Sequence, residues 1–158
     1  MLRLIGALPG RRNDAVAIVN GLFGDALDER KSSLATPMTL RAGDTVLPLD
    51  RDALPAALAR AGVPARSRVC VLVHGLMSTE SVWQLPDPPD ATYGTLLAED
   101  HDMTVLTVRY NTGRHISTNG HEFSRLLAEL VRAWPVRVRE INLIGHSMGC
   151  LLYTSDAA

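Results

Sequence analysis

The stretch from Ile141 to Gly149 constrains the fold more than any other part of the chain. Four residues of a buried strand, Ile141-Asn142-Leu143-Ile144, run directly into Gly145-His146-Ser147-Met148-Gly149. A G-x-S-x-G sequence after an apolar strand is typical of a sharp turn from strand to helix. In such a turn the serine is strained and the glycines let neighbouring backbone pass closely. The pattern therefore predicts that Ser147 sits at the end of a strand in an α/β architecture.

The elements before this turn alternate between strand and helix from Arg68 onward. The continuous apolar run 69–73 predicts a parallel strand covered on both faces. A short helix near 93–99, a second buried strand at 103–108 and an amphipathic helix from Glu122 to Trp134 follow, and a polar loop is predicted from Arg109 to Gly120. This order predicts an α/β fold with a mostly parallel sheet and right-handed crossovers. The sheet is expected to be truncated after the G-x-S-x-G turn.

The pattern of the first 67 residues indicates an amino-terminal accessory segment. A helix is expected from Asn13 or Asp14, with apolar residues at helical spacing: Val16, Val19, Phe23, Ala26 and Leu27. A hairpin is expected across Arg41 to Asp44, followed by a helix over 53–61 that Asp52 caps and Gly62 ends. The expected organisation is therefore 1–67 as the accessory segment, 68–149 as the front half of the core, and 150–158 as a tail.

Composition gives few hints about partners or compartment. The formal net charge is −1, so neither nucleic acid nor an anionic membrane surface is expected to bind the chain. The apolar start, Met1 to Pro9, is too short for a transmembrane helix and lacks a clear cleavage site, so a cytoplasmic location without an integral membrane segment is the default expectation. Cys70 and Cys150 do not make a disulfide framework and are expected to be inert.

Hydrolysis of an ester by serine needs a nucleophile, a base that takes its proton, and donors that hold the developing oxyanion. Ser147 is the candidate nucleophile. The backbone N–H of Met148, the residue that follows it, is one candidate donor. The second donor is expected in the loop after an earlier strand, where His74-Gly75-Leu76 makes the N–H of Leu76, or less favourably that of Met77, the candidate.

With these motifs the chain resembles the α/β-hydrolase family, specifically its bacterial lipase and esterase branch, which includes proteins similar to GPI inositol-deacylases. The residues that carry the resemblance are Val73-His74-Gly75-Leu76, Tyr93-Gly94, Tyr110 to Ile116, Asn119-Gly120 and Gly145 to Gly149. The resemblance covers about Asn20 to Gly149. It implies a partial α/β-hydrolase fold and a serine hydrolase that acts on a small-molecule or lipid carboxylic ester without a cofactor. It carries over Ser147 as nucleophile and Leu76 and Met148 as oxyanion donors.

Further residues are assigned by their place beside these motifs. The glycines expected to shape the loop and the turn are Gly75, Gly145 and Gly149. Loops at the carboxyl ends of parallel strands lie where such sheets bind ligands. The candidate pocket residues are therefore His74, Met77, Tyr110, Asn111 and His146. The alternative is that residues 111–120 only supply turns and a helix cap.

The resemblance also implies a triad in the order serine, acid, histidine, but no histidine follows Ser147 in this chain. None of the five histidines is expected to be the base, because the family order places the base elsewhere. Asp156 is rejected as the acid because it lies too close to Ser147. His115 and His121 have no third ligand at metal spacing, so no metal site is predicted.

The chain as written is therefore expected to be inactive or nearly so. Two other functions stay open: a non-catalytic binding module for small molecules, and an acyltransferase on the same fold. The tail from Cys150 to Ala158 is also expected to be foreign to the natural protein. It reads as one frame of a widely used transposon-end sequencing adapter. Oligomeric state is not predicted.

Overall fold

The computed structural model describes residues 14–22, 24, 36–87 and 91–154. Its centre is a five-stranded sheet in the order β2-β1-β4-β3-β5. The strands are β1 (Thr39–Ala42), β2 (Thr45–Val46), β3 (Arg68–Val73), β4 (Thr104–Arg109) and β5 (Glu140–Gly145). β3 pairs in parallel with both β4 and β5, whereas β1 is antiparallel to both β2 and β4. The α/β class is confirmed. The sheet is mixed: β4, β3 and β5 are parallel to one another, and the hairpin strands β1 and β2 complete the other side.

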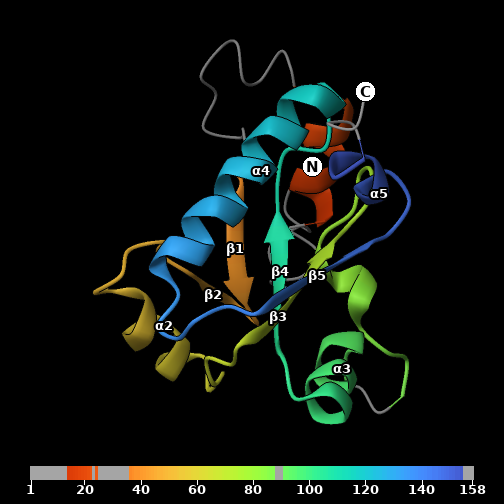
Figure 1. The fold of residues 1–158 in the computed structure, drawn as a ribbon. Helices are drawn as coiled ribbons and strands as arrows, with labels where there is room; N and C mark the ends of the chain where they lie inside the picture. The colour runs from red at the N-terminus through yellow and green to blue at the C-terminus, as the bar shows by residue number, and fades with distance from the viewer. Residues whose placement is uncertain (1–13, 23, 25–35, 88–90, 155–158) are drawn as a thin grey trace.

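Helices cover both faces of this sheet (Figure 1). On one face α2 (Leu54–Arg60) and α4 (Ile116–Ala133) enclose the larger core, which contains Val69, Val71 and Val73 of β3. On the other face Cys70 and Leu72 pack with Trp83 and Met103, beside the 3-10 helix η1 (Glu80–Trp83) and α3 (Tyr93–His101). Alternate β3 side chains thus enter two cores, which explains the unbroken apolar run predicted for this strand.

The amino-terminal hairpin extends the same sheet. The turn between β1 and β2 contains Gly43 at φ 55°, a left-handed conformation that glycine adopts without steric cost. Leu40 of β1 pairs with Val108 of β4 and is fully buried. The hairpin expected in the accessory segment therefore contributes an edge of the central sheet and part of its core.

The helix after this hairpin lacks the cap predicted for it. Its N-cap position is Ala53, no side chain makes a capping hydrogen bond, and the prediction that Asp52 caps α2 is wrong. Asp50 Oδ1 instead holds the turn before the helix, where it accepts hydrogen bonds from the backbone N–H groups of Asp52 and Ala53, both at 3.0 Å. Gly62, at φ 67°, follows the end of the helix as predicted.

The loop predicted from Arg109 to Gly120 is shorter than expected. β4 includes Arg109, and α4 begins at Ile116, six residues before the predicted start at Glu122. Asn119 and Gly120 are buried in the first turns of α4. The sequence pattern did not predict these turns as helix, because they contain polar residues and a glycine and the regular apolar stripe begins only at Phe123.

The described part of the amino-terminal helix covers residues 14–22, and the predicted apolar positions Phe23, Ala26 and Leu27 lie outside the described residues. Within it Val19 is 38% exposed, whereas Asn20 is 1% exposed. Asn20 Nδ2 donates to Val16 O, and its Oδ1 accepts from Thr36 N–H. The helix therefore buries a hydrogen-bonded amide and leaves part of its predicted apolar stripe in solvent.

Candidate active site

The G-x-S-x-G segment folds as a tight turn between β5 and the short helix α5 (Gly149–Leu152). Ser147 has φ 55° and its side chain is exposed. This left-handed conformation is unusual for a residue with a Cβ and is characteristic of strained functional turns. Each residue assigned to the turn by sequence thus stands where the strand-to-helix prediction put it.

Close backbone packing explains the two glycines of the turn. A Cβ on Gly149 would lie 2.3 Å from the Val73 carbonyl oxygen, and one on Gly145 would lie 2.7 Å from the Cys150 backbone nitrogen. The His146 N–H also donates to the Val73 oxygen at 2.9 Å. The turn is therefore pressed against the carboxyl end of β3, and a side chain at either glycine would push it away.

The loop after β3 faces this turn. A Cβ on Gly75 would lie 2.9 Å from Ser147 Cβ and 3.0 Å from the His146 carbonyl oxygen. Leu76 and Met77, the next two residues, are 47% and 36% exposed, and Met77 has φ 54°. Gly75 thus lies directly against the candidate nucleophile. It brings residues 74–77, the candidate oxyanion loop, next to Ser147.

The two candidate donors of this loop differ in their hydrogen bonds. The Met77 N–H donates to Thr112 Oγ1 at 3.1 Å. Within the described part of the chain, neither the Leu76 N–H nor the Met148 N–H donates a hydrogen bond to the protein. The pair Leu76 and Met148 is therefore the one that keeps its donors available for a bound oxygen, whereas Met77 is already engaged.

His74 and Tyr110 form a buried pair behind the loop. Their rings stack with centroids 4.6 Å apart, and Tyr110 Oη donates to the His74 carbonyl oxygen at 2.7 Å. Burial lowers the pKa of His74, so its imidazole is neutral at pH 7. Burial likewise raises the pKa of Tyr110. These two groups are suited to holding the loop in place, and neither is exposed to solvent.

The remaining candidate pocket residues also differ in burial. Asn111 is 2% exposed, and it donates to the Gly24 carbonyl oxygen and accepts from the Gly113 N–H. His146 is exposed, and its ring lies edge-on to Trp83 with centroids 6.3 Å apart. Met77 and His146 therefore border the surface beside Ser147, while His74, Tyr110 and Asn111 lie beneath it.

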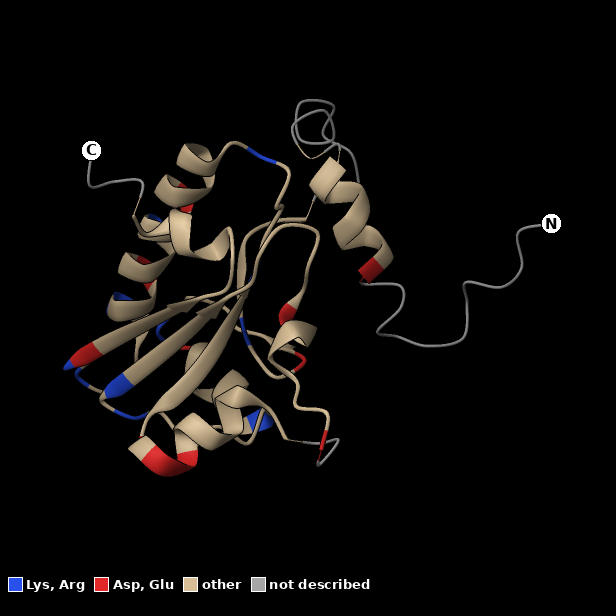
Figure 2. Cartoon of the chain, turned by 90° about the vertical axis from the view of Figure 1, so that its right-hand side faces the viewer, with Lys and Arg blue, Asp and Glu red and all other residues tan. Residues whose placement is uncertain are grey.

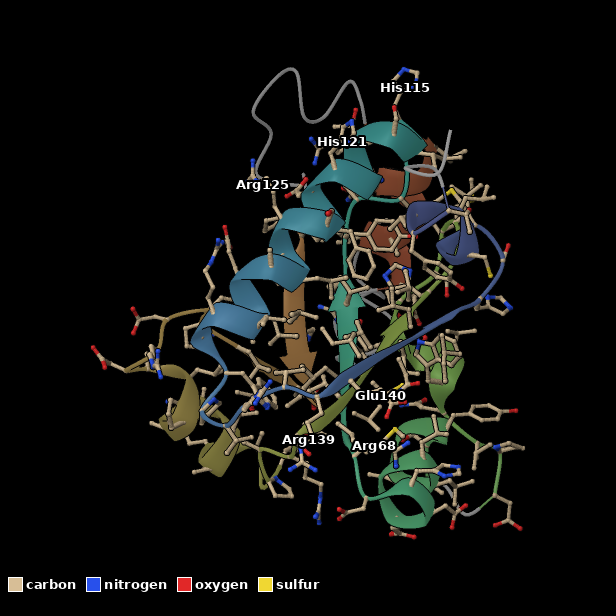
Figure 3. The ribbon with its side chains drawn as sticks, in the orientation of Figure 1. Arg68, His115, His121, Arg125, Arg139 and Glu140 are labelled. Carbon is tan, nitrogen blue, oxygen red and sulfur yellow. The ribbon has the colours of Figure 1, made fainter. Side chains whose placement is uncertain are left out.

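The other histidines do not converge on the turn. Figure 3 shows His115 and His121 at the amino end of α4, and Arg68, Arg139 and Glu140 near the opposite end of the sheet. Among the residues that the structure describes, no three His, Cys, Asp or Glu side chains are placed to hold a metal ion.

The described helices include none long and apolar enough to cross a membrane. Figure 2 shows acidic and basic residues interspersed over the described chain.

A separate hollow of about 880 Å³ lies on the α3 face of the sheet, and Ser147, Leu76 and Met148 do not line it. Glu80 lies at its wall, paired with Arg109 through Arg109 Nε at 2.9 Å and with Arg41 Nε at 3.5 Å. Burial acts to raise the pKa of Glu80, but the hydrogen bond from Arg109, a backbone hydrogen bond and the charges of Arg109 and Arg41 together outweigh burial, so the pKa is lowered. Sequence reasoning missed this network, because its members come from β1, η1 and β4.

No family model, curated protein or solved structure matches the chain. Its function must therefore be inferred from the chemistry of the site.

Proposed function

We propose that this chain carries the nucleophile half of a serine hydrolase that acts on carboxylic esters. The observation that carries the proposal is the strained, exposed Ser147 at the end of β5, packed against Gly75. Ser147 would attack the ester carbonyl, and the N–H groups of Leu76 and Met148 would hold the oxyanion. In such sites one oxyanion donor contributes roughly 2.7–4 kcal/mol to transition-state stabilisation.

The surface beside Ser147 suits an apolar acyl group. Leu76 and Met77 are exposed on the loop, and Ile18 and Leu22 are 47% and 58% exposed on the neighbouring helix. That helix lies against the loop, since a Cβ on Gly21 would be 2.4 Å from Met77 Cγ. A lipid or medium-chain ester would cover this apolar surface when its carbonyl reaches Ser147.

Among the described residues near Ser147, none is placed as the base or the acid of a triad. Within the described chain no side chain forms a hydrogen bond with the Ser147 hydroxyl. His74, although close in the chain to Gly75, is buried and is occupied by Tyr110 and by a 3.0 Å contact of Nδ1 with the Gly75 oxygen. We propose that the base and the acid are supplied by residues other than those that the described chain brings to Ser147.

A fluorophosphonate probe tests the proposal on two chains. One is the 158-residue chain, and the other continues past Gly149 with the natural sequence amplified from the source locus. The longer chain should label at Ser147 and hydrolyse p-nitrophenyl esters, whereas the short chain should label slowly. Ser147→Ala is the control and should abolish labelling in both. An unlabelled longer chain that still binds the ester would favour a binding module, and acyl transfer to an added alcohol would favour an acyltransferase.

The same amplification tests the tail hypothesis. Sequence other than Cys150 to Ala158 after the Gly149 codon is expected, together with an acid and then a histidine. Finding these nine residues in the source locus would refute a foreign origin.

A further inference from the structure

The loop after β4 contacts the candidate oxyanion loop at two points on either side of Leu76. Tyr110 Oη donates to the His74 carbonyl oxygen, two residues before Leu76. Thr112 Oγ1 accepts from the Met77 N–H, one residue after it. Both donor–acceptor distances, 2.7 Å and 3.1 Å, are those of ordinary hydrogen bonds. The backbone that carries the Leu76 N–H is thus fixed at both ends.

Thr112 has the more specific effect of these two anchors. Met77 adopts φ 54°, which a residue with a Cβ rarely does unless its surroundings enforce it. The Thr112 hydroxyl engages the Met77 N–H in that conformation. It therefore withdraws one of the two competing donors and leaves the Leu76 N–H as the one able to meet an oxygen bound at Ser147.

The anchor is itself rigidly held. Thr112 is 2% exposed, and Asn119 Nδ2 of α4 donates to the backbone oxygen of the preceding residue, Asn111. A Cβ on Gly113 would lie 1.9 Å from the Asn20 carbonyl oxygen, so the loop is wedged against the amino-terminal helix. Because α4 and this helix both immobilise residues 111–113, the Thr112 hydroxyl has little freedom to follow a displaced Met77.

We propose that Thr112 is a positioning residue for the oxyanion hole, which selects the Leu76 N–H as donor by binding the Met77 N–H. This inference rests on the proposed serine hydrolase function and deepens it. Thr112 does not touch the substrate. It acts on the geometry of the loop, where displacements of about 1 Å can change rates by up to about 10²-fold.

The test uses an alkylboronic acid: the Ser147 oxygen bonds to boron, the hydroxyl proton passes to solvent buffer, and the adduct is a tetrahedral anion. Amide proton and nitrogen shifts of the ¹⁵N-labelled 158-residue chain are recorded during the titration. In the wild type the Leu76 and Met148 amides should shift and the Met77 amide should not. Thr112→Val removes the acceptor but keeps the shape, and should speed hydrogen exchange at Met77 by about 10-fold or more and weaken boronate binding by a similar factor.

Two further variants separate positioning from general destabilisation. Thr112→Ser keeps the hydroxyl and should restore the wild-type shifts and affinity. Thr118→Val makes the same exchange at an exposed site on α4 and should change neither. Thr112→Ala takes the place of the valine variant if the latter does not fold, as judged by the dispersion of its amide spectrum.

The outcomes also separate this inference from the proposed function. Boronate binding at Ser147 with a shift at Met77 instead of Leu76, or with equal affinity in Thr112→Val, would overturn the role of Thr112 and leave the hydrolase proposal standing. Failure of the wild-type chain to bind boronate at Ser147, with Met77 exchange still dependent on Thr112, would overturn the role of Thr112 in selecting an oxyanion donor, whereas the hydrolase proposal is decided separately by fluorophosphonate labelling of the longer chain.

Discussion

Replacing Gly149 with alanine tests whether the G-x-S-x-G turn packs on β3 as described. The new Cβ would lie 2.3 Å from the Val73 oxygen and 2.7 Å from the His74 oxygen, against ordinary contact at 3.4 Å or more. Relief therefore requires the backbone to move by about 1.1 Å, the difference between 2.3 and 3.4 Å. Both obstacles are backbone oxygens of buried residues, one in the last residue of β3 and one in the residue after it, so no flexible side chain can give way.

The expected loss of unfolding free energy is about 3 kcal/mol, the upper part of the range for overpacked sites. For a chain of this size, 1 kcal/mol corresponds to about 2–4 °C in Tm, so Tm should fall by about 6–12 °C. Urea unfolding followed by far-UV circular dichroism measures the same loss at constant temperature, with an unchanged m value if both states keep their compactness.

Gly43→Ala is the matched control. Gly43 has φ 55°, and a Cβ there would meet nothing within 4 Å, so the substitution introduces only the conformational penalty of the left-handed region. That penalty is about 1 kcal/mol. If Gly149→Ala lowers the unfolding free energy no more than Gly43→Ala does, the contact between the turn and β3 is wrong, and with it the geometry proposed for Ser147.

Three further predictions concern single contacts. Because burial lowers the pKa of His74 below 6.5, the folded state resists the proton that the unfolded chain accepts; stability should fall as pH drops below about 6.5, and His74→Gln should flatten that slope in melts between pH 8 and 5. Glu80→Gln should lower the unfolding free energy by about 3 kcal/mol in urea titrations at pH 7, since it leaves Arg109 and Arg41 without their carboxylate, and the difference from wild type should shrink as pH falls below about 4.5. Asp50→Ala should lower Tm by about 2–4 °C through loss of about 1 kcal/mol from the hydrogen bonds that its side chain accepts in the turn before α2, whereas an Asp52 substitution that lowered Tm equally would contradict this role of Asp50.

Local sequence patterns predicted the parts of the fold that depend on neighbouring residues. The apolar run 69–73 predicted a strand with both faces covered, and in the structure alternate side chains of β3 enter hydrophobic cores on the two faces of the sheet. The turn at Gly145 to Gly149 was predictable from its motif, although the backbone atoms that leave no room for a side chain at Gly149 belong to Val73 and His74. The prediction of a cap by Asp52 was wrong because aspartate is common both at helix caps and in turns, and only the backbone conformation distinguishes the two.

Contacts between distant residues could not be predicted from one sequence. Thr112 and Met77 are 35 residues apart, and Thr79 Oγ1 donates to Asp14 Oδ1 across 65 residues. Nothing in a threonine's immediate neighbours indicates whether its hydroxyl faces solvent or a backbone N–H. The candidates for the second oxyanion donor could thus be narrowed to Leu76, or less favourably Met77, from the motif alone, and the hydrogen bond to Thr112 is what distinguishes them in the structure.

The loop after β4 shows why polarity was a poor guide in this region. Asn111, Thr112 and Asn119 were predicted in or near a polar loop, yet each is at most 2% exposed. Their amide and hydroxyl groups pair with backbone groups of the amino-terminal helix, the oxyanion loop and the residues after β4. A solvated loop and a buried loop that satisfies its neighbours' backbone select the same residue types, since both need hydrogen-bonding groups and tight turns. Their difference lies in what the side chains meet, and here they meet the segment that is proposed to hold the oxyanion.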